Sequence, residues 1–335
     1  MDPLSGTQCQ SATCIGATAQ RVLVDSSSGR VLAVVRGAVY LRSDSGELIW
    51  LNSESAPMHG RGLCLSGGLP RPAAGSAYVV AGDRLAIDGE TITVEWGRAV
   101  LWSPEAPRRQ AGQSLEDIGH LLQTGRPAYA GLGEPRGFGA LLSLPQPVGG
   151  HPTDKDPATF QALLTGLPAA RRMAEACTAR DLGEILDAAD DLVGLGEGLT
   201  PSGDDFVGGM LFAIVNLQAL YAPFPACSPS DFRPFLGRAR QSTNIISFTL
   251  LSDHTAGQAS EPEHRFLSAL LAGCPTEVVR HTASDVVRIG HTTGWDLLAG
   301  IWVAVANMAH GARFPSEVSA SGVALAEDHG RHGSQ

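Results

Sequence analysis

Lysine is nearly absent from this chain of 335 residues: among its 24 lysines and arginines, Lys155 is the one lysine. Lys155 lies in a polar Asp-Lys-Asp run with no glycine-rich loop before it. The sequence therefore excludes a P-loop lysine, which needs such a loop, and argues against a Schiff-base lysine, which needs a desolvated amine. Any contact to an anion must come from arginine, histidine or backbone N–H groups.

Paired cysteines, a basic surface and a long apolar segment are lacking as well. The six cysteines form no C-x-x-C pair, so they indicate scattered reduced thiols and no zinc site of the usual cysteine spacing. A net charge of −10 argues against nucleic acid or anionic lipid as a partner. The N-terminus lacks the pattern of a signal peptide, and the most apolar run, 297–309, is too short to span a bilayer. We expect a cytoplasmic protein without a membrane partner.

The hydrophobic pattern predicts an α+β fold in which strands come first and helices follow. Short β-type segments separated by glycine-rich turns indicate a small barrel or sandwich, and helical patterns dominate after a proline-rich stretch near Ser103. The expected division is a loose N-terminus, a β-rich domain, a mainly α-helical domain and a flexible tail: 1–18, 19–103, 104–312 and 313–335.

Two loop-to-helix junctions of the same design stand out in the helical part. Ser202-Gly203-Asp204-Asp205 aligns with Thr293-Gly294-Trp295-Asp296, 91 residues later, and a small pair follows each, Gly208-Gly209 or Ala299-Gly300. Each junction fits a helix capping box, and capping alone could explain the hydroxyls and the carboxylates. Capping does not explain the glycines in front of the first junction, nor those inside the first helical turns, which weaken a helix.

A glycine loop that leads into a helix start presents N–H groups and a partial positive charge, which favours phosphate, a carboxylate or a developing oxyanion. We therefore expect an anion site where the two helix starts converge. Asp204 and Asp205 would repel an anion unless Mg²⁺ bridged them, one of them capped the helix, or one accepted a hydrogen bond from a substrate nitrogen. The sequence leaves these alternatives open.

The stretch 196–206, Gly-x-Gly-Leu-Thr-Pro-Ser-Gly-Asp-Asp-Phe, resembles the signature of the AllH family, described as a subunit of oxamate carbamoyltransferase. The second junction, 290–300, fits the family's second motif with threonine at position 293. Ser242-Thr243-Asn244-Ile245-Ile246-Ser247 resembles the hydroxyl-rich helix between them. The resemblance implies a β-rich N-terminal part and a helical C-terminal part.

The resemblance also implies transfer of a carbamoyl group between a ureido acid and phosphate, in allantoin-type purine breakdown. Carbamoyl phosphate or a ureido acid would be the small anionic ligand, and the activity would belong to an assembly with other subunits, one of them acyl-CoA-synthetase-like. Two alternatives remain: a non-catalytic scaffold subunit of such a complex, and a stand-alone enzyme with Mg²⁺ on Asp204 and Asp205. The Ser-x-Arg-Thr loop of ordinary transcarbamoylases is absent from the sequence.

Each candidate residue has an expected role. Amides at the helix starts would stabilise the oxyanion of the carbamoyl carbon, Arg240 or Arg288 would hold phosphate, and His291 would carry a proton to the leaving nitrogen. The candidate catalytic residues are Asp204, Asp205, His291 and Asp296. The candidate ligand-binding residues are Gly196, Gly198, Thr200, Ser202, Gly203, Arg240, Ser242, Thr243, Thr292, Thr293 and Gly294.

Overall fold

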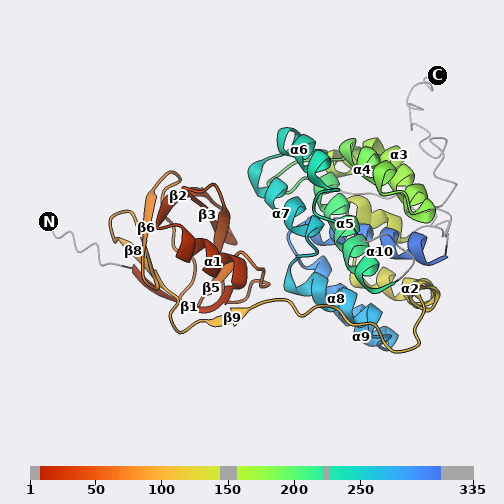
Figure 1. Cartoon of the computed structure of the whole chain (residues 1–335), viewed down its shortest axis with the longest axis horizontal. Helices are drawn as coiled ribbons and strands as arrows, with labels where there is room; N and C mark the ends of the chain where they lie inside the picture. Colours follow the sequence, from red (N-terminus) through yellow and green to blue (C-terminus); the bar gives the residue numbers. More distant parts are fainter. Residues whose placement is uncertain (1–7, 144–156, 222–226, 311–335) are drawn as a thin grey trace, which may run out of the picture.

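A computed structural model describes residues 8–143, 157–221 and 227–310. The expected tail over 313–335 lies outside these residues. The chain folds into an N-terminal β-barrel followed by a helical part, so the predicted α+β class is confirmed and the β-rich part is a barrel (Figure 1).

Eight strands close the barrel in the order β5-β4-β3-β2-β6-β7-β8-β1, because β1 pairs with both β8 and β5, and β9 adds a ninth strand against β1. The strands are β1 Gln8–Gly16, β2 Ser28–Val34, β3 Ala38–Ser43, β4 Leu48–Ser53, β5 Gly62–Leu65, β6 Ala77–Ala81, β7 Arg84–Ile87, β8 Ile92–Glu95 and β9 Val100–Trp102. Helix α1 (Ala17–Asp25) follows β1. The expectation of a loose segment over 1–18 is wrong for residues 8–16, because β1 joins the two sides of the barrel.

The helical part surrounds two central helices, α5 and α10, which are buried along most of their length (Figure 1). A helix that is apolar on all sides needs neighbours on all sides, and the surrounding helices supply them. The helices are α2 Leu115–Tyr129, α3 Pro157–Ala179, α4 Leu182–Asp190, α5 Ser202–Leu220, α6 Arg233–Ser242, α7 Ile245–Thr255, α8 Glu261–Leu271, α9 Thr276–Val287 and α10 Thr293–His310, with the 3-10 segments Ala130–Leu132 and Gly137–Ser143 after α2.

A continuous helix over 231–254 is what the sequence predicts, but the structure has two helices there. The backbone leaves the helical region at Thr243 (ψ 173°), and Asn244 starts α7 by accepting hydrogen bonds from the N–H groups of Ile246 and Ser247. An asparagine N-cap satisfies amides that a new helix leaves unpaired, so it marks a helix start. The break turns Thr243 and Ser247 toward the start of α5.

Arg61 joins the barrel to the helical part through a buried ion pair. Its Nε and Nη2 donate to the two carboxylate oxygens of Asp253 at 2.6 and 2.8 Å, and its Nη1 donates to Glu47 at 2.7 Å. Beside it, the Glu261 N–H donates to the Met58 carbonyl at 2.8 Å, and His59 forms a β-bridge with Ser260. The two parts therefore meet through specific polar contacts between β4–β5 and α7–α8.

Replacing Arg61 with leucine is expected to lower the free energy of unfolding by about 3–5 kcal/mol, because it leaves the buried Asp253 carboxylate without its partner. Chemical denaturation measures the change. Arg172→Leu is the matched control, since Arg172 also bridges two acids, Glu184 and Asp191, but is exposed. The control should lose far less stability, because exposed ion pairs contribute little. Equal losses in the two variants would contradict a buried link.

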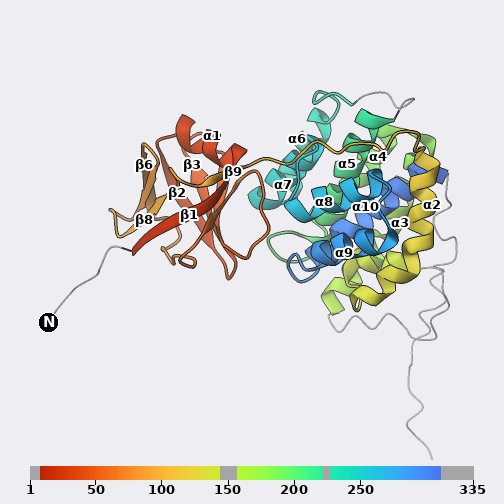
Figure 2. The same ribbon diagram turned by 90° about the horizontal axis from the view of Figure 1, so that it is seen from below.

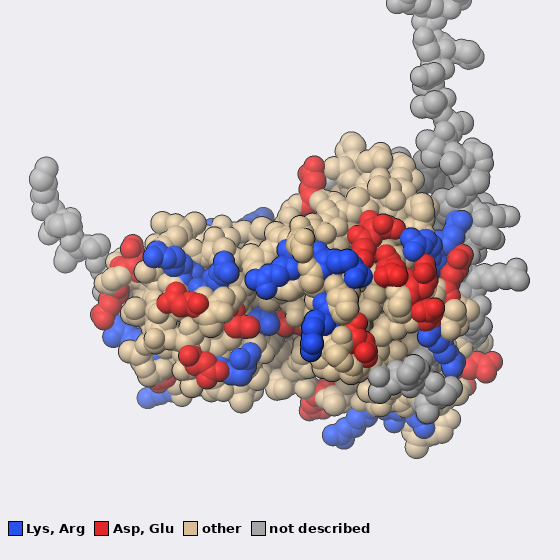
Figure 3. All heavy atoms as spheres, turned by 45° about the horizontal axis from the view of Figure 1, so that its top comes forward, with Lys and Arg blue, Asp and Glu red and all other residues tan. Residues whose placement is uncertain are grey.

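No helix in the described ranges is both long and apolar enough to cross a membrane. On the face shown in Figure 3, the described acidic and basic side chains are interspersed, and no continuous basic stripe runs across it.

Candidate functional site

The starts of α5 and α10 lie against each other. The hydroxyl oxygens of Thr200, just before α5, and Thr293, the first residue of α10, are 2.9 Å apart in a hydrogen bond. Behind them the helices are in backbone contact: a Cβ on Gly209 would lie 2.3 Å from the Leu297 carbonyl oxygen, and one on Gly300 would lie 2.1 Å from that of Phe206. The small residues at these positions therefore allow the two backbones to come into contact.

The loops in front of both helices use glycine for its backbone conformation. Gly194, Gly196 and Gly198 have φ values of 85°, 114° and 97°, and Gly290 has a φ of 59°. This region is costly for residues with a Cβ, so glycine is the residue that fits. The three glycines before α5 therefore serve the turn itself.

The two junctions fold alike. A Cβ on Gly203 would lie 2.0 Å from the Leu192 carbonyl oxygen, and one on Gly294 would lie 2.0 Å from the Val286 carbonyl oxygen. Their N–H groups donate to Leu195 and Ile289 carbonyls, both at 2.9 Å. The expectation that Gly203 and Gly294 offer free amides to an anion is wrong, because the loops already occupy these donors.

The predicted capping box at Ser202 is also wrong. Helix α5 begins at Ser202 itself, its N-cap residue is Pro201, and no side chain caps it. Thr293 is likewise the first residue of its helix, and the Thr292 carbonyl before it accepts from the N–H groups of Trp295 and Asp296. The Asp205 and Asp296 carboxylates are therefore available for contacts other than capping.

Asp204 holds the first junction together. Its carboxylate accepts hydrogen bonds from the Gly194 N–H at 2.5 Å, from the Ser247 hydroxyl at 2.5 Å and from the Thr243 hydroxyl. Burial raises the pKa of Asp204, and the donors from Ser247, Thr243 and Gly194 oppose that shift. A Mg²⁺ ion on Asp204 would have to displace these donors. Among the described residues, no group of three metal-ligating side chains is found.

Asp205 and Asp296 form a buried acidic pair between the helices. Both are almost inaccessible to solvent, at 4% and 0% exposure. Asp296 accepts a hydrogen bond from the Phe138 N–H at 2.7 Å, while the Asp205 Oδ2 atom has no hydrogen-bond partner in the described parts of the chain. Burial raises the pKa of Asp205 well above its ordinary value, Asp296 adds to the rise, and the Thr293 and Thr200 hydroxyls oppose it. Burial and the neighbouring Asp296 therefore favour the protonated form of Asp205.

The remaining predicted residues lie at the edge of the site or away from it. His291 is exposed, and its Nδ1 lies 2.6 Å from Nη1 of Arg136. Arg240 is exposed and lies over the Phe248 ring, 5.7 Å from its centroid, and Arg288 pairs with Asp285. The Ser242 hydroxyl donates back to the Arg238 carbonyl of its own helix. The structure thus brings His291 to the edge of the site and engages Arg240, Arg288 and Ser242 elsewhere.

Two contributors were not found by sequence reasoning. Arg136 and the Phe138 N–H come from the 3-10 segment Gly137–Ser143 and the residues before it, where the sequence predicts only a glycine- and proline-rich loop. A Cβ on Gly137 would lie 2.3 Å from Asp296 Oδ1, so this glycine permits the loop to approach the carboxylate. The glycine is the one signal in the sequence that could have indicated the contact.

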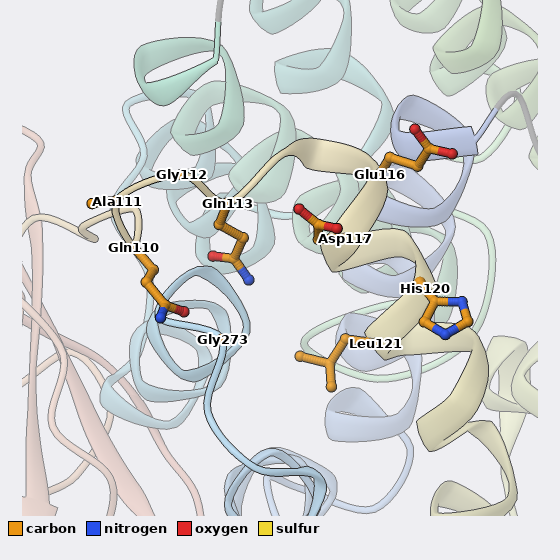
Figure 4. A pocket seen from close by; sticks show the side chains of 9 residues that line it. All are labelled: Gln110, Ala111, Gly112, Gln113, Glu116, Asp117, His120, Leu121 and Gly273. Carbon is orange, nitrogen blue, oxygen red and sulfur yellow. The ribbon is translucent and has the colours of Figure 1, made fainter.

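A surface hollow of about 640 Å³ lies elsewhere, between the start of α2 and the turn after α8 (Figure 4). Gln110, Gln113, Glu116, Asp117 and His120 are among its lining residues. None of the predicted site residues lines it. Glu116 and Asp117 line this open hollow, and their negative charges would repel a small anion.

The fold and the paired helix starts define an α+β protein with a buried site of carboxylates and hydroxyls in its helical part. Residues 192–305 match the family model described as "Oxamate carbamoyltransferase subunit AllH". The matched segment carries both helix starts, so the similarity to this family lies in the part of the chain that holds the candidate site. No solved structure matches the chain.

Proposed function

We propose that this chain is a subunit of a carbamoyltransferase-type enzyme that transfers a carbamoyl group between a ureido acid and phosphate. One observation carries the proposal: the AllH match spans both helix starts, and these are the segments that place Asp205, Asp296, Thr200 and Thr293 together. Other subunits, including an acyl-CoA-synthetase-like one, would complete the enzyme, and we expect the assembly to work in the cytoplasm.

The acidic pair suits the proton balance of this reaction. A phosphate oxygen attacks the carbamoyl carbon, the bond from that carbon to the ureido nitrogen breaks, and the products are an amide such as oxamate and carbamoyl phosphate. Hydrogen phosphate loses a proton and the leaving nitrogen gains one, so one proton moves with no net change. Two neighbouring carboxyl groups that share one proton can give it to the nitrogen and take the other from phosphate.

The charges around the pair fit a ligand that brings both hydrogen-bond donors and negative charge. A carbamoyl NH₂ group can donate to a carboxylate, while the hydroxyls of Thr200 and Thr293 can donate to its carbonyl oxygen. Arg136, beside His291 at the edge of the site, supplies positive charge for a phosphate or a carboxylate. In this proposal the Thr200 and Thr293 hydroxyls and Arg136 bind the ligand oxygens, a role that the sequence assigned to the amides of Gly203 and Gly294.

A scaffold subunit is the alternative that a specific observation favours. Asp204 and Asp296 are 1% and 0% exposed and accept hydrogen bonds from the protein itself, which is what carboxylates with a purely structural role do. In that case, the chemistry would lie on a partner subunit.

Ligand binding by the purified full chain tests the proposal. Carbamoyl phosphate or oxamate is expected to raise the melting temperature, because a ligand at 100 times its Kd stabilises the folded state by about 2.7 kcal/mol. Thermal-shift measurements should show the rise for the wild type and its loss in Asp205→Asn. An equal rise in both proteins would place the ligand elsewhere, and no rise with either compound would favour the scaffold alternative.

A further inference from the structure

Two cysteines lie opposite each other where β1 and β5 meet and close the barrel. The antiparallel pairing of these strands places Cys14 of β1 directly across from Cys64 of β5. Figure 2 shows β1 as the long red strand of the barrel. Both residues are free thiols. The sequence indicated scattered thiols because the two residues are far apart along the chain, and the strand pairing brings them together.

Both cysteine side chains point away from the barrel core. Cys64 lies between two leucines of β5 that belong to the core, so its own side chain projects outward. On β1, Ala12 and Ile15 belong to the core, and the pairing register shifts between Ala12 and Cys14. The shift adds one residue to β1, as a β-bulge does, so Cys14 lies on the outside as well. The two thiols therefore share one face of the sheet.

The strand pairing also sets the distance between the two residues. Directly opposed residues of an antiparallel pair have Cα atoms about 4.5 or 5.5 Å apart, and a disulfide spans Cα atoms about 4.4–6.8 Å apart. The Cys64 Sγ now lies 3.1 Å from the Met58 Sδ. A disulfide to Cys14 therefore needs a rotation of the Cys64 side chain, while the backbone already has the required spacing.

We infer that Cys14 and Cys64 form a reversible disulfide between β1 and β5 when a small-molecule disulfide, such as oxidised glutathione, acts as the oxidant. The Cys14 thiolate attacks one sulfur of the oxidant, whose S–S bond breaks, and the first glutathione leaves with the proton that Cys14 gave up. The Cys64 thiolate then attacks the Cys14 sulfur of this mixed disulfide, and the second glutathione leaves with the proton of Cys64. The two cysteines are oxidised, and the oxidant is reduced to two thiols.

Exposure sets the order of the two steps. Cys14 is partly exposed and meets the oxidant first, whereas Cys64 is only 3% exposed and is shielded from it. Burial raises the pKa of both thiols, that of Cys64 to about 11. Because the thiolate is the attacking species, the bond should form slowly at neutral pH and faster as the pH rises. The pair therefore stays reduced in a reducing compartment and responds to an excess of oxidised glutathione.

Incubation of the purified full chain with oxidised glutathione at mildly alkaline pH, followed by peptide mapping without reduction, tests the pair. Mass spectrometry should find the peptides of Cys14 and Cys64 joined by a bond that dithiothreitol breaks. In Cys64→Ser, the Cys14 peptide should carry glutathione instead. Cys9→Ser is the matched control, because Cys9 lies on the same strand but opposite Thr93, and it should form the bond as the wild type does. A wild-type map without the joined peptides would overturn the inference.

The melting temperature shows whether the bond fits the folded barrel. A disulfide between β1 and β5 restricts the unfolded chain, so the oxidised wild type should melt about 5 °C or more above the reduced protein. The oxidant should leave the melting temperature of Cys64→Ser unchanged. Joined peptides without a rise in melting temperature would mean that the bond forms only in a distorted barrel, and would overturn the inference. Neither measurement depends on carbamoyl transfer, so the proposed function is tested separately.

Discussion

Replacing Gly300 with alanine is expected to lower the free energy of unfolding by about 3 kcal/mol or more, the largest stability effect that we predict for a single methyl group. The new Cβ would lie 2.1 Å from the Phe206 carbonyl oxygen and 2.9 Å from the Met210 nitrogen. Both are backbone atoms of α5, so the two central helices would have to move apart. Urea denaturation monitored by circular dichroism measures the change.

The matched control is Gly237→Ala in α6. Gly237 also lies inside a helix, but it is exposed and no heavy atom stands within 4 Å of the position of its Cβ. Alanine there should stabilise the protein by roughly 0.5–1 kcal/mol, because it restricts the unfolded chain and favours helix. A Gly300→Ala variant as stable as the wild type would show that α5 and α10 are not in backbone contact in solution.

The largest expected effect on activity is that of Asp205→Asn in the reconstituted enzyme. If Asp205 carries the proton that reaches the leaving nitrogen, its loss should reduce carbamoyl transfer by about 100-fold or more, the usual contribution of a general acid. The rate of carbamoyl phosphate formation from a ureido acid and phosphate is the measurement. Activity equal to that of the wild type, in a complex that still assembles, would favour the scaffold alternative.

The same substitution should stabilise the fold at neutral pH. The folded-state pKa of Asp205 is raised above its ordinary value of 3.8, so folding favours the protonated form. The wild type therefore loses stability as the pH rises through the folded-state pKa, whereas asparagine has no proton to lose. The melting temperature of Asp205→Asn should exceed that of the wild type by an amount that grows with pH.

Asp25→Asn on the exposed α1 is the control for this pH dependence, because its side chain is 65% exposed. Its melting temperature should follow that of the wild type across the pH range. A lower melting temperature for Asp205→Asn at neutral pH would mean that the ionised carboxylate stabilises the fold, and the proton-carrying role would then fail.

Local sequence patterns predicted the parts of this molecule that depend on local chemistry. The barrel strands follow from short apolar segments between glycine-rich turns, and both junctions carry a hydroxyl-Gly-x-Asp pattern at the start of a helix. The close contact at Gly209 and Gly300 was predictable because glycine weakens a helix unless something approaches it. Strand β1 was missed because its sequence is small and polar, and its pairing with β5 and β8 supplies the order.

Contacts between distant segments could not be predicted. Two partners of Asp204 come from the end of α6 and the start of α7, and that of Asp296 comes from the 3-10 segment Gly137–Ser143. Each of these hydrogen bonds depends on how whole helices and loops pack together, and residue spacing along the sequence does not predict that packing. The capping boxes illustrate the reverse error: the residue types fit, but each helix begins one residue earlier than a capping hydroxyl requires.

The contacts of α5 and α10 are reciprocal: Gly209 lies against the Leu297 backbone and Gly300 against the Phe206 backbone, and these residues hold corresponding positions after the two junctions. The symmetry is broken at one position, where Asp204 of the first half corresponds to Trp295 of the second. The two junctions therefore place similar carboxylates, Asp205 and Asp296, at corresponding positions but surround them differently. Asp204 is held by the hydroxyls of Thr243 and Ser247, whereas Trp295 packs against the backbone at Gly139.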